Sequence, residues 1–413
     1  MQLPTLAILA VSLFLALAGF GIVIPALPFY TARLQGEGPT VGLTVGLLMA
    51  SYSLVQFACA PLWGHLSDRI GRRPVFLAGL AGFALSFVLM GTAQGLFWLF
   101  AARILGGVLS AALIPAALAM VADLTSETDR GKGMGIAGAA MGLGFVFGPA
   151  IGGMLARGDD FSLPFFVAAA VAAMTFLVAA SSLRESRGLV ASAAGQAALP
   201  LLERLGRHGA ELWRWLALTF VQTAAFAAME ATLALYGRDV FGLRAVDVGW
   251  LMALIGLVSA AFSGGLAGRV IRRFGEVATL RAGFALFAVG FWGATAATSL
   301  PLFASAMTVV GVGMACMRPS LTSAVSKGAG DATGSAMGLM QSCDSLARVA
   351  GPALGGALYV LGHSLPYATA SAVSAAAVAF TLLALPQPAR PSLPDTSSGL
   401  PLAASTPEPA ARG

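Results

Sequence analysis

The sequence predicts an all-α integral membrane protein with 12 transmembrane helices, arranged as two six-helix repeats. Three observations predict this: the composition, the length of the apolar runs, and a repeat within the chain. Of the 413 residues, 58% are hydrophobic and 10% are charged, whereas soluble domains carry about 25% charged residues. The apolar runs are about 20 residues long, which is the length that a helix needs to cross the hydrocarbon core.

We expect the spans at roughly 6–28, 42–63, 75–93, 96–122, 133–156, 163–183, 213–236, 246–268, 277–297, 300–325, 333–360 and 366–385. The first run is longer than the apolar part of a signal peptide, and no Lys or Arg precedes it. We therefore expect it to be the first spanning helix. Loops of a few residues join most of the spans.

The positions of Lys and Arg predict the orientation. If the N-terminus is cytoplasmic, external loops hold only Arg33, Arg157, Arg238 and Arg244, while most other Lys and Arg residues of the loops and tails are cytoplasmic. The positive-inside rule favours this threading. The sequence thus predicts a protein of the bacterial-type inner membrane, embedded in the lipid bilayer, with both termini cytoplasmic.

Other classes of function are excluded by the same pattern. The net charge of +6 lies in short loops, not on a basic helix face, so a nucleic-acid partner is not expected. Cys59, Cys316 and Cys343 stand singly in apolar runs, and the three histidines are scattered. We expect no disulfide, no metal and no cofactor. No Walker A motif or catalytic cluster indicates an enzyme.

The chain divides into two six-helix bundles, 1–183 and 213–385, joined by a cytoplasmic central loop, 184–212. Leucines at 201, 205 and 212 fall near one face of a possible amphipathic surface helix, and a solvated linker is an equal alternative. A tail, 386–413, is rich in Pro, Ser and Ala, and is expected to be disordered in the cytoplasm.

The two bundles are copies of each other. Residues 45–50 recur at 248–253, and 64–71 recur at 268–275. The pattern Gly-Pro-x-x-Gly-Gly at 148–153 recurs at 351–356. Parallel repeats of this kind imply a pseudo-twofold axis along the membrane normal and a substrate path between the halves.

One basic stretch, 64–74, lies between the second and third spans and must lie at a membrane surface. It contains Gly64, Asp68, Arg69, Gly71, Arg72 and Arg73. Its spacing, G-x-x-x-D-R-x-G-R-R-P, resembles the loop between helices 2 and 3 of the major facilitator superfamily. The resemblance implies that Asp68, Arg72 and Asp123 form a charge cluster that stabilises the outward-facing state and that breaks when the cytoplasmic side opens. The alternative is that these charges only fix the topology.

The fifth span carries glycines on one face, which lets a neighbouring helix approach closely. Gly144, Gly148, Pro149, Gly152 and Gly153 form the pattern G-x-x-x-G-P-x-x-G-G. It resembles the helix 5 motif of superfamily antiporters, which implies export by a member of the twelve-span drug/proton antiporter branch. Multidrug and tetracycline exporters are the most similar types. Tetracycline exporters have several acids inside their first half, where this chain has only Arg103, which argues against tetracycline as the substrate.

Charges within the spans cost about 2.5–3.5 kcal/mol each at a helix centre, so each needs a reason. Arg103-x-x-x-Gly107 resembles a helix 4 motif of proton-coupled members, which implies that Arg103 acts on the protonation of a neighbouring acid. Glu230 and Asp344 are the candidate proton carriers. Arg348 follows Asp344 by one turn, which permits a structural ion pair, so we prefer Glu230 as the titrating group. Arg318 is a possible partner of either acid.

A substrate cavity is expected where polar and aromatic side chains share helix faces. Its candidates are Tyr52, Gln56, Gln222, Phe226 and Gln341. Abundant Met and Phe suit promiscuous binding of hydrophobic molecules. The sequence thus predicts a monomeric, proton-coupled antiporter that exports hydrophobic small molecules or drugs. A metabolite or sugar exporter or importer, or a transport-inactive receptor or sensor, is the alternative.

Overall fold

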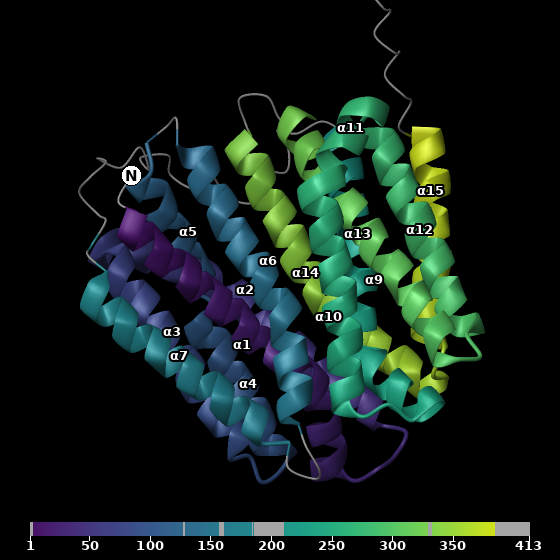
Figure 1. Ribbon diagram of the computed structural model, residues 1–413, viewed down its shortest axis with the longest axis horizontal. Coiled ribbons are helices and arrows are strands. Elements are labelled where there is room, and N and C mark those ends of the chain that lie inside the picture. The colour runs from purple at the N-terminus through teal and green to yellow at the C-terminus, as the bar shows by residue number, and fades with distance from the viewer. Residues whose placement is uncertain are drawn as a thin grey trace, which may run out of the picture.

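The computed structural model describes residues 3–126, 129–156, 161–183, 185, 210–328 and 333–384. All regular structure in these ranges is helical, and the helices form two bundles side by side (Figure 1). The predicted helix in the central loop and the predicted disordered tail lie outside the described residues. So does the side chain of Asp68, although its backbone belongs to a helix.

The N-terminal bundle, purple to teal in Figure 1, contains seven described helices. They are α1 (Leu3–Gln35), α2 (Val41–Ile70), α3 (Arg72–Gly91), α4 (Leu96–Ser110), α5 (Leu113–Leu124), α6 (Arg130–Leu155) and α7 (Leu163–Ser182). Helices α4 and α5 follow each other directly and together make one span, Leu96–Leu124.

The C-terminal bundle, green to yellow, begins at α9 (Ala210–Phe241). It continues with α10 (Ala245–Phe262), the π-helical turn η1 (Ser263–Ala267), α11 (Gly268–Phe274), α12 (Glu276–Ala296), α13 (Leu300–Gly328), α14 (Thr333–Leu361) and α15 (Leu365–Ala384). The segments α10, η1 and α11 form one span, Ala245–Phe274.

Within the described ranges, 11 helices are long and apolar enough to cross a membrane. The remaining long helix, α14, has 29 residues but is more polar, because it carries Gln341, Asp344 and Arg348. The predicted all-helical membrane fold is confirmed. The boundaries of the two bundles stay predictions.

One end of the molecule gathers the ends of α2, α11 and α13 and the start of α6, and we call it the basic end. It carries Arg72, Lys132, Arg272 and Lys327. The N-terminal start of α1 lies at the same end (Figure 1). The sequence predicts that this end is cytoplasmic.

Two tight turns at the basic end occupy equivalent positions of the two repeats. Gly71 precedes α3 with φ 106°, and Gly275 precedes α12 with φ 83°. Only glycine adopts this region without strain. The turns allow each long helix to reverse direction at once into the next one.

The bundles meet through two helix pairs that the repeat relates, α6 with α10 and α2 with α14. These contacts are close at the end opposite the basic end. A methyl group at Gly153 of α6 would lie 2.6 Å from the carbonyl oxygen of Ala245. One at Gly42 of α2 would lie 2.7 Å from the ring of Tyr359. Glycine is required at 153 because the backbones of α6 and α10 touch, and at 42 because the Tyr359 side chain lies against α2.

Toward the basic end the bundles separate. A methyl group at Gly138 of α6, at Gly264 of η1 or at Gly338 of α14 would meet no atom within 4 Å. The side chains of Leu62 and Leu66 on α2 are exposed there. The protein is thus open between its bundles at the basic end and closed at the opposite end.

Candidate substrate and proton site

The glycines of the fifth span hold α6 against two neighbours. A methyl group at Gly148 would lie 2.5 Å from the carbonyl oxygen of Ala18 in α1, and one at Gly144 would lie 2.9 Å from the backbone nitrogen of the same residue. Gly152 approaches Ile22 in the same way. Gly153 faces α10 of the other bundle instead. The motif therefore serves packing within one bundle and contact between the bundles.

The stretch 64–74 is anchored within the N-terminal bundle. Arg72 donates from Nε to Asp123 Oδ2 at 2.6 Å, and Arg73 donates to the carbonyl oxygen of Ala180 at 2.6 Å. The backbone N–H groups of Arg72 and Arg73 donate to the carboxylate of Glu185 at 2.9 and 3.1 Å. Arg69 and Gly64 lie exposed at the surface.

The expected charge cluster of Asp68, Arg72 and Asp123, and its breaking when the basic end opens, stay predictions, because the side chain of Asp68 lies outside the described residues. The structure describes the pair of Arg72 and Asp123. The basic end is open in this conformation, and the ion pair is formed. Both residues belong to one bundle, in α3 and at the end of α5. Movement of one bundle away from the other leaves their distance unchanged. Sequence reasoning missed Glu185, although an acid directly after the last span of the first half was a usable signal.

Arg103 lies in the interior of the N-terminal bundle, and its residue is 4% exposed. Its guanidinium carbon stands 4.4 Å from the centre of the Tyr52 ring, and its Nε donates to the carbonyl oxygen of Leu48 at 3.3 Å. Tyr52 Oη shares a hydrogen bond with Ser110 Oγ at 2.7 Å. The ring face of Tyr52 thus helps to hold a cation that would otherwise be costly to bury.

Glu230 lies across the bundle interface from Arg103. Its side chain is 1% exposed, and Oε2 stands 4.0 Å from Nη1 of Arg348. Within the described part of the chain, Oε1 of Glu230 is buried without a hydrogen-bond partner. The charges of Arg348 and Arg103 both act on this carboxyl group. Glu230 is therefore a loosely held buried acid with Arg348 of its own bundle as its ion-pair partner.

Asp344 is held much more tightly. Its Oδ1 accepts a hydrogen bond from Thr223 Oγ1 at 2.6 Å and one from Arg318 at 2.8 Å, and Oδ2 stands 2.7 Å from the same guanidinium. The couple between Asp344 and Arg348 that the one-turn spacing permitted is not the pairing found. Arg318 pairs with Asp344, because α13 approaches α14 there. Arg348 pairs with Glu230 instead.

The remaining predicted cavity residues differ in burial. Gln222 is 1% exposed, and its Oε1 has no hydrogen-bond partner among the described residues. Phe226 stands between Gln222 and Glu230 on α9 and is buried. Gln341 is exposed and Gln56 is half-buried. Tyr52, Gln222, Phe226 and Glu230 are thus buried side chains, whereas Gln56 and Gln341 are partly or largely exposed.

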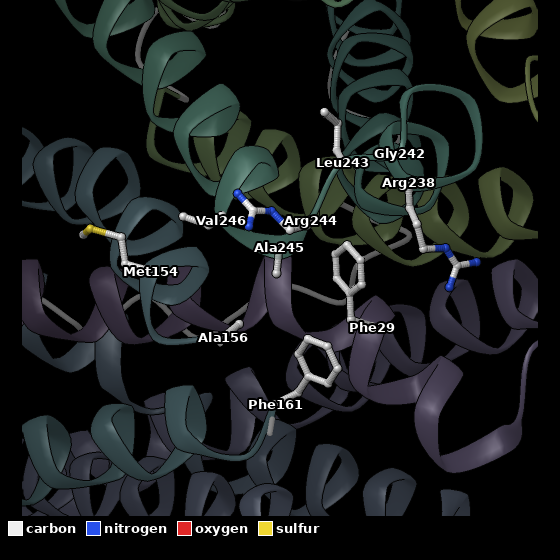
Figure 2. Close-up of a pocket in the computed structure, with 10 residues that line it drawn as sticks. All are labelled: Phe29, Met154, Ala156, Phe161, Arg238, Gly242, Leu243, Arg244, Ala245 and Val246. Carbon is white, nitrogen blue, oxygen red and sulfur yellow. The ribbon is translucent and has the colours of Figure 1, made fainter. Parts of the chain in front are cut away.

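A separate cavity of about 710 Å³ lies at the closed end, lined by residues of both bundles. Figure 2 shows Phe29 and Phe161 on one side and Arg238 and Arg244 on the other. Arg238 bridges the bundles here, with Nη1 3.0 Å from Glu37 Oε1 and Nε 2.7 Å from Asp239 Oδ1. None of the predicted cavity residues lines this space.

Comparison with known proteins gives the relatives of this chain. The family described as Major Facilitator Superfamily matches residues 9–276 and 246–410. Multidrug resistance protein 1 of Bacillus subtilis (strain 168) is 31% identical over 380 residues, covering 92% of this chain and 95% of the relative. Tetracycline resistance protein, class G, of Vibrio anguillarum is 33% identical, covering 83% and 86%. The crystal structure of the human organic anion transporter MFSD10 (TETRAN) has a TM-score of 0.67 and 27% identity, covering 91% and 98%.

Proposed function

Because the chain belongs to the Major Facilitator Superfamily, we propose that it exports hydrophobic, drug-like small molecules in exchange for protons. Its relatives include proteins named for multidrug and tetracycline resistance, and it is a transporter rather than an enzyme. The observation that carries the proposal is Glu230, a buried carboxyl group with one oxygen that has no hydrogen-bond partner among the described residues.

Glu230 suits proton binding better than Asp344 because its surroundings tolerate both protonation states. A buried carboxylate without partners favours its protonated form. Arg348, only 4.0 Å away, compensates the charged form. Asp344 is bound by Thr223 and Arg318, so its carboxylate joins α14 to α9 and α13. We assign the transported proton to Glu230 and a positioning role to Asp344.

The open and closed ends support alternating access. In the orientation that we propose, the basic end is cytoplasmic, both termini are cytoplasmic, and the protein lies as a monomer in the bacterial inner membrane. The present conformation then faces inward and is ready to receive a substrate from the cytoplasm or the inner leaflet. Outward opening requires separation of α2 from α14 and of α6 from α10 at the opposite end.

The stretch 64–74 has a different task in this scheme. The side chains of Arg72 and Arg73 bond within the N-terminal bundle, and the backbone N–H group of Arg72 bonds to Glu185 directly after it. They keep the basic end of that bundle rigid, so that the bundle moves as one body. That Asp68 joins Arg72 and Asp123 in a charge cluster in the outward-facing state remains our proposal.

The test is drug susceptibility in an efflux-deficient bacterial host, together with proton antiport in everted vesicles. Wild type is expected to raise resistance to hydrophobic drugs, and Glu230→Gln is expected to lose both resistance and substrate-induced proton movement while it still binds substrate. Glu211→Gln is the matched control, because this acid lies exposed on the same helix. Full proton antiport by Glu230→Gln would remove Glu230 from the mechanism.

A further inference from the structure

A second cavity, of about 650 Å³, lies at the open basic end along α13. Its lining includes Ser263, Arg318, Thr322, Ser323, Ser326 and Lys327. The α13 residues among them fall in two neighbouring rows with a spacing of four, Arg318, Thr322 and Ser326 in one and Ser323 and Lys327 in the other, so they form one stripe along the helix. The stripe runs from Arg318, deep in the span, to Lys327 at the rim. We call this space the α13 groove.

The charges that a molecule would meet in the α13 groove are cationic. The side chains of Arg318 and Lys327 are 44% and 69% exposed, whereas those of their acidic partners Asp344 and Glu276 are 4% and 22% exposed. Each acid therefore lies behind its cation. A guanidinium has five N–H donors, and Arg318 contacts Asp344 through Nη1.

We propose that the α13 groove binds the carboxylate of amphipathic substrates, which makes organic acids and zwitterions with an apolar body a substrate class of this protein. A guanidinium in a partly desolvated site favours a carboxylate because it forms charge-assisted hydrogen bonds with it. Lys327 at the rim attracts the anion, and Arg318 holds it in the span. The transport role of this site rests on the export function proposed above.

The α13 groove is separate from the proton site. Arg318 pairs with Asp344, and Glu230 pairs with Arg348. A substrate carboxylate that binds Arg318 consequently leaves the pair of Glu230 and Arg348 in place. Anion recognition and proton exchange therefore use different cations of the C-terminal bundle.

The experiment measures fluorescence binding of three probes that share one apolar body: pyrenebutanoic acid, pyrenebutanol and pyrenebutylamine. The full chain is used, in phosphatidylcholine nanodiscs without a proton gradient. Wild type is expected to bind the acid more tightly than the alcohol or the amine. The double variant Arg318→Gln/Asp344→Asn leaves no unpaired buried carboxylate. Its affinity for pyrenebutanoic acid is expected to be about tenfold lower than that of wild type. The affinity of this variant for pyrenebutanol should equal that of wild type, which also shows that the variant is folded.

Two further variants and one lipid change sharpen the test. The double variant Lys327→Gln/Glu276→Gln is expected to lower the affinity for pyrenebutanoic acid about threefold, because Lys327 contributes only a contact at the rim. Arg269→Gln, an exposed cation of α11, should have no effect. Nanodiscs with phosphatidylglycerol should leave the affinity for the acid unchanged. Loss of acid binding in them would show a lipid headgroup site and overturn the proposal.

Equal affinity of wild type for the acid and the alcohol would also overturn it, as would undiminished acid preference in Arg318→Gln/Asp344→Asn. These results do not depend on transport. A chain that prefers the acid but gives no drug resistance would contradict the export function and leave the α13 groove standing. A protein that confers drug resistance but does not prefer the acid would support the export function and contradict the proposal for the α13 groove.

Discussion

Glu230 and Asp344 are buried acids of the same bundle, and their partners give them different tasks. Asp344 accepts hydrogen bonds from Thr223 and Arg318, whereas Glu230 has one cation at 4.0 Å. Removing one partner of a buried pair typically costs about 3–5 kcal/mol, and the cost at Asp344 is expected to be smaller because the Arg318 side chain is 44% exposed. Loss of the charge at Asp344 thus affects the fold, and loss of the charge at Glu230 affects transport.

Asp344→Asn is accordingly expected to lower the melting temperature of the purified protein, because the contacts of Asp344 with Thr223 of α9 and Arg318 of α13 are weakened. Glu230→Gln should change the melting temperature little. Scanning fluorimetry in detergent compares the two variants, with Glu211→Gln as the exposed control. A larger loss of stability in Glu230→Gln than in Asp344→Asn would contradict the assignment of roles.

Tyr52 offers a second residue-level prediction. Its ring lies under Arg103, and its hydroxyl group bonds to Ser110. Tyr52→Phe keeps the ring and is expected to retain most transport, while Tyr52→Leu removes the cation–π contact, worth about 0.5–2 kcal/mol, and should reduce transport at least several-fold. Equal transport rates of the two variants in vesicles would show that the ring face has no role.

At the scale of elements, the two bundles carry the same ion pair with the charges exchanged. Arg72 of α3 pairs with Asp123 at the end of α5, and 204 residues later Glu276 of α12 pairs with Lys327 of α13. Each pair ties the first turn of one helix to the end of another at the basic end. Both bundles thus place opposite charges at these two positions, in opposite order.

A charge exchange tests this. Arg72→Asp and Asp123→Arg are each expected to lower the amount of folded protein in the membrane, because each puts like charges together. The combined exchange should recover most of it. The pair is partly exposed, so a coupling free energy of about 1 kcal/mol is expected from the double-mutant cycle. If the losses of folded protein in the two single variants simply added up in the double variant, the ion pair would have no role in stabilising the bundle.

Glycines decide which conformations the helices can reach. Gly153 lies against α10 in the closed end, whereas Gly138 of the same helix faces open space. Gly153→Leu should therefore disfavour the conformation described here and increase labelling of cysteines placed at the opposite end. Gly138→Leu is expected to disfavour closure of the basic end and to change the labelling in the other direction. The same shift in both variants would contradict this view of α6.

At the scale of the whole molecule, a cross-link can hold the bundles in this conformation. A Cβ at Gly256 of α10 would lie 3.5 Å from the Cβ of Val146 in α6, within the range of a disulfide. In a background without Cys59, Cys316 and Cys343, Val146→Cys/Gly256→Cys should cross-link on oxidation, stop export and retain substrate binding from the basic side. Reduction should restore export, and continued export by the oxidised form would contradict alternating access between these bundles.

The sequence determined the fold class, the spans and the repeat, because hydrocarbon length, apolar runs and matched motifs are local properties of the chain. It also indicated Arg103, Glu230, Asp344, Arg318 and Arg348, because any charge inside an apolar span is conspicuous. It did not determine which of these acids forms an ion pair with which of these arginines. Arg348 was adjacent to Asp344 by one turn, yet it faces Glu230.

Only the tertiary structure decided those pairings, since they depend on the rotation of α13 and α14 against α9. It likewise showed that Arg72 and Asp123 share one bundle and stay together while the basic end is open. Spacing along a chain fixes neighbours within a helix, but contacts between helices come from how the packed bundles turn their faces to each other. The proton site and the α13 groove are products of that packing.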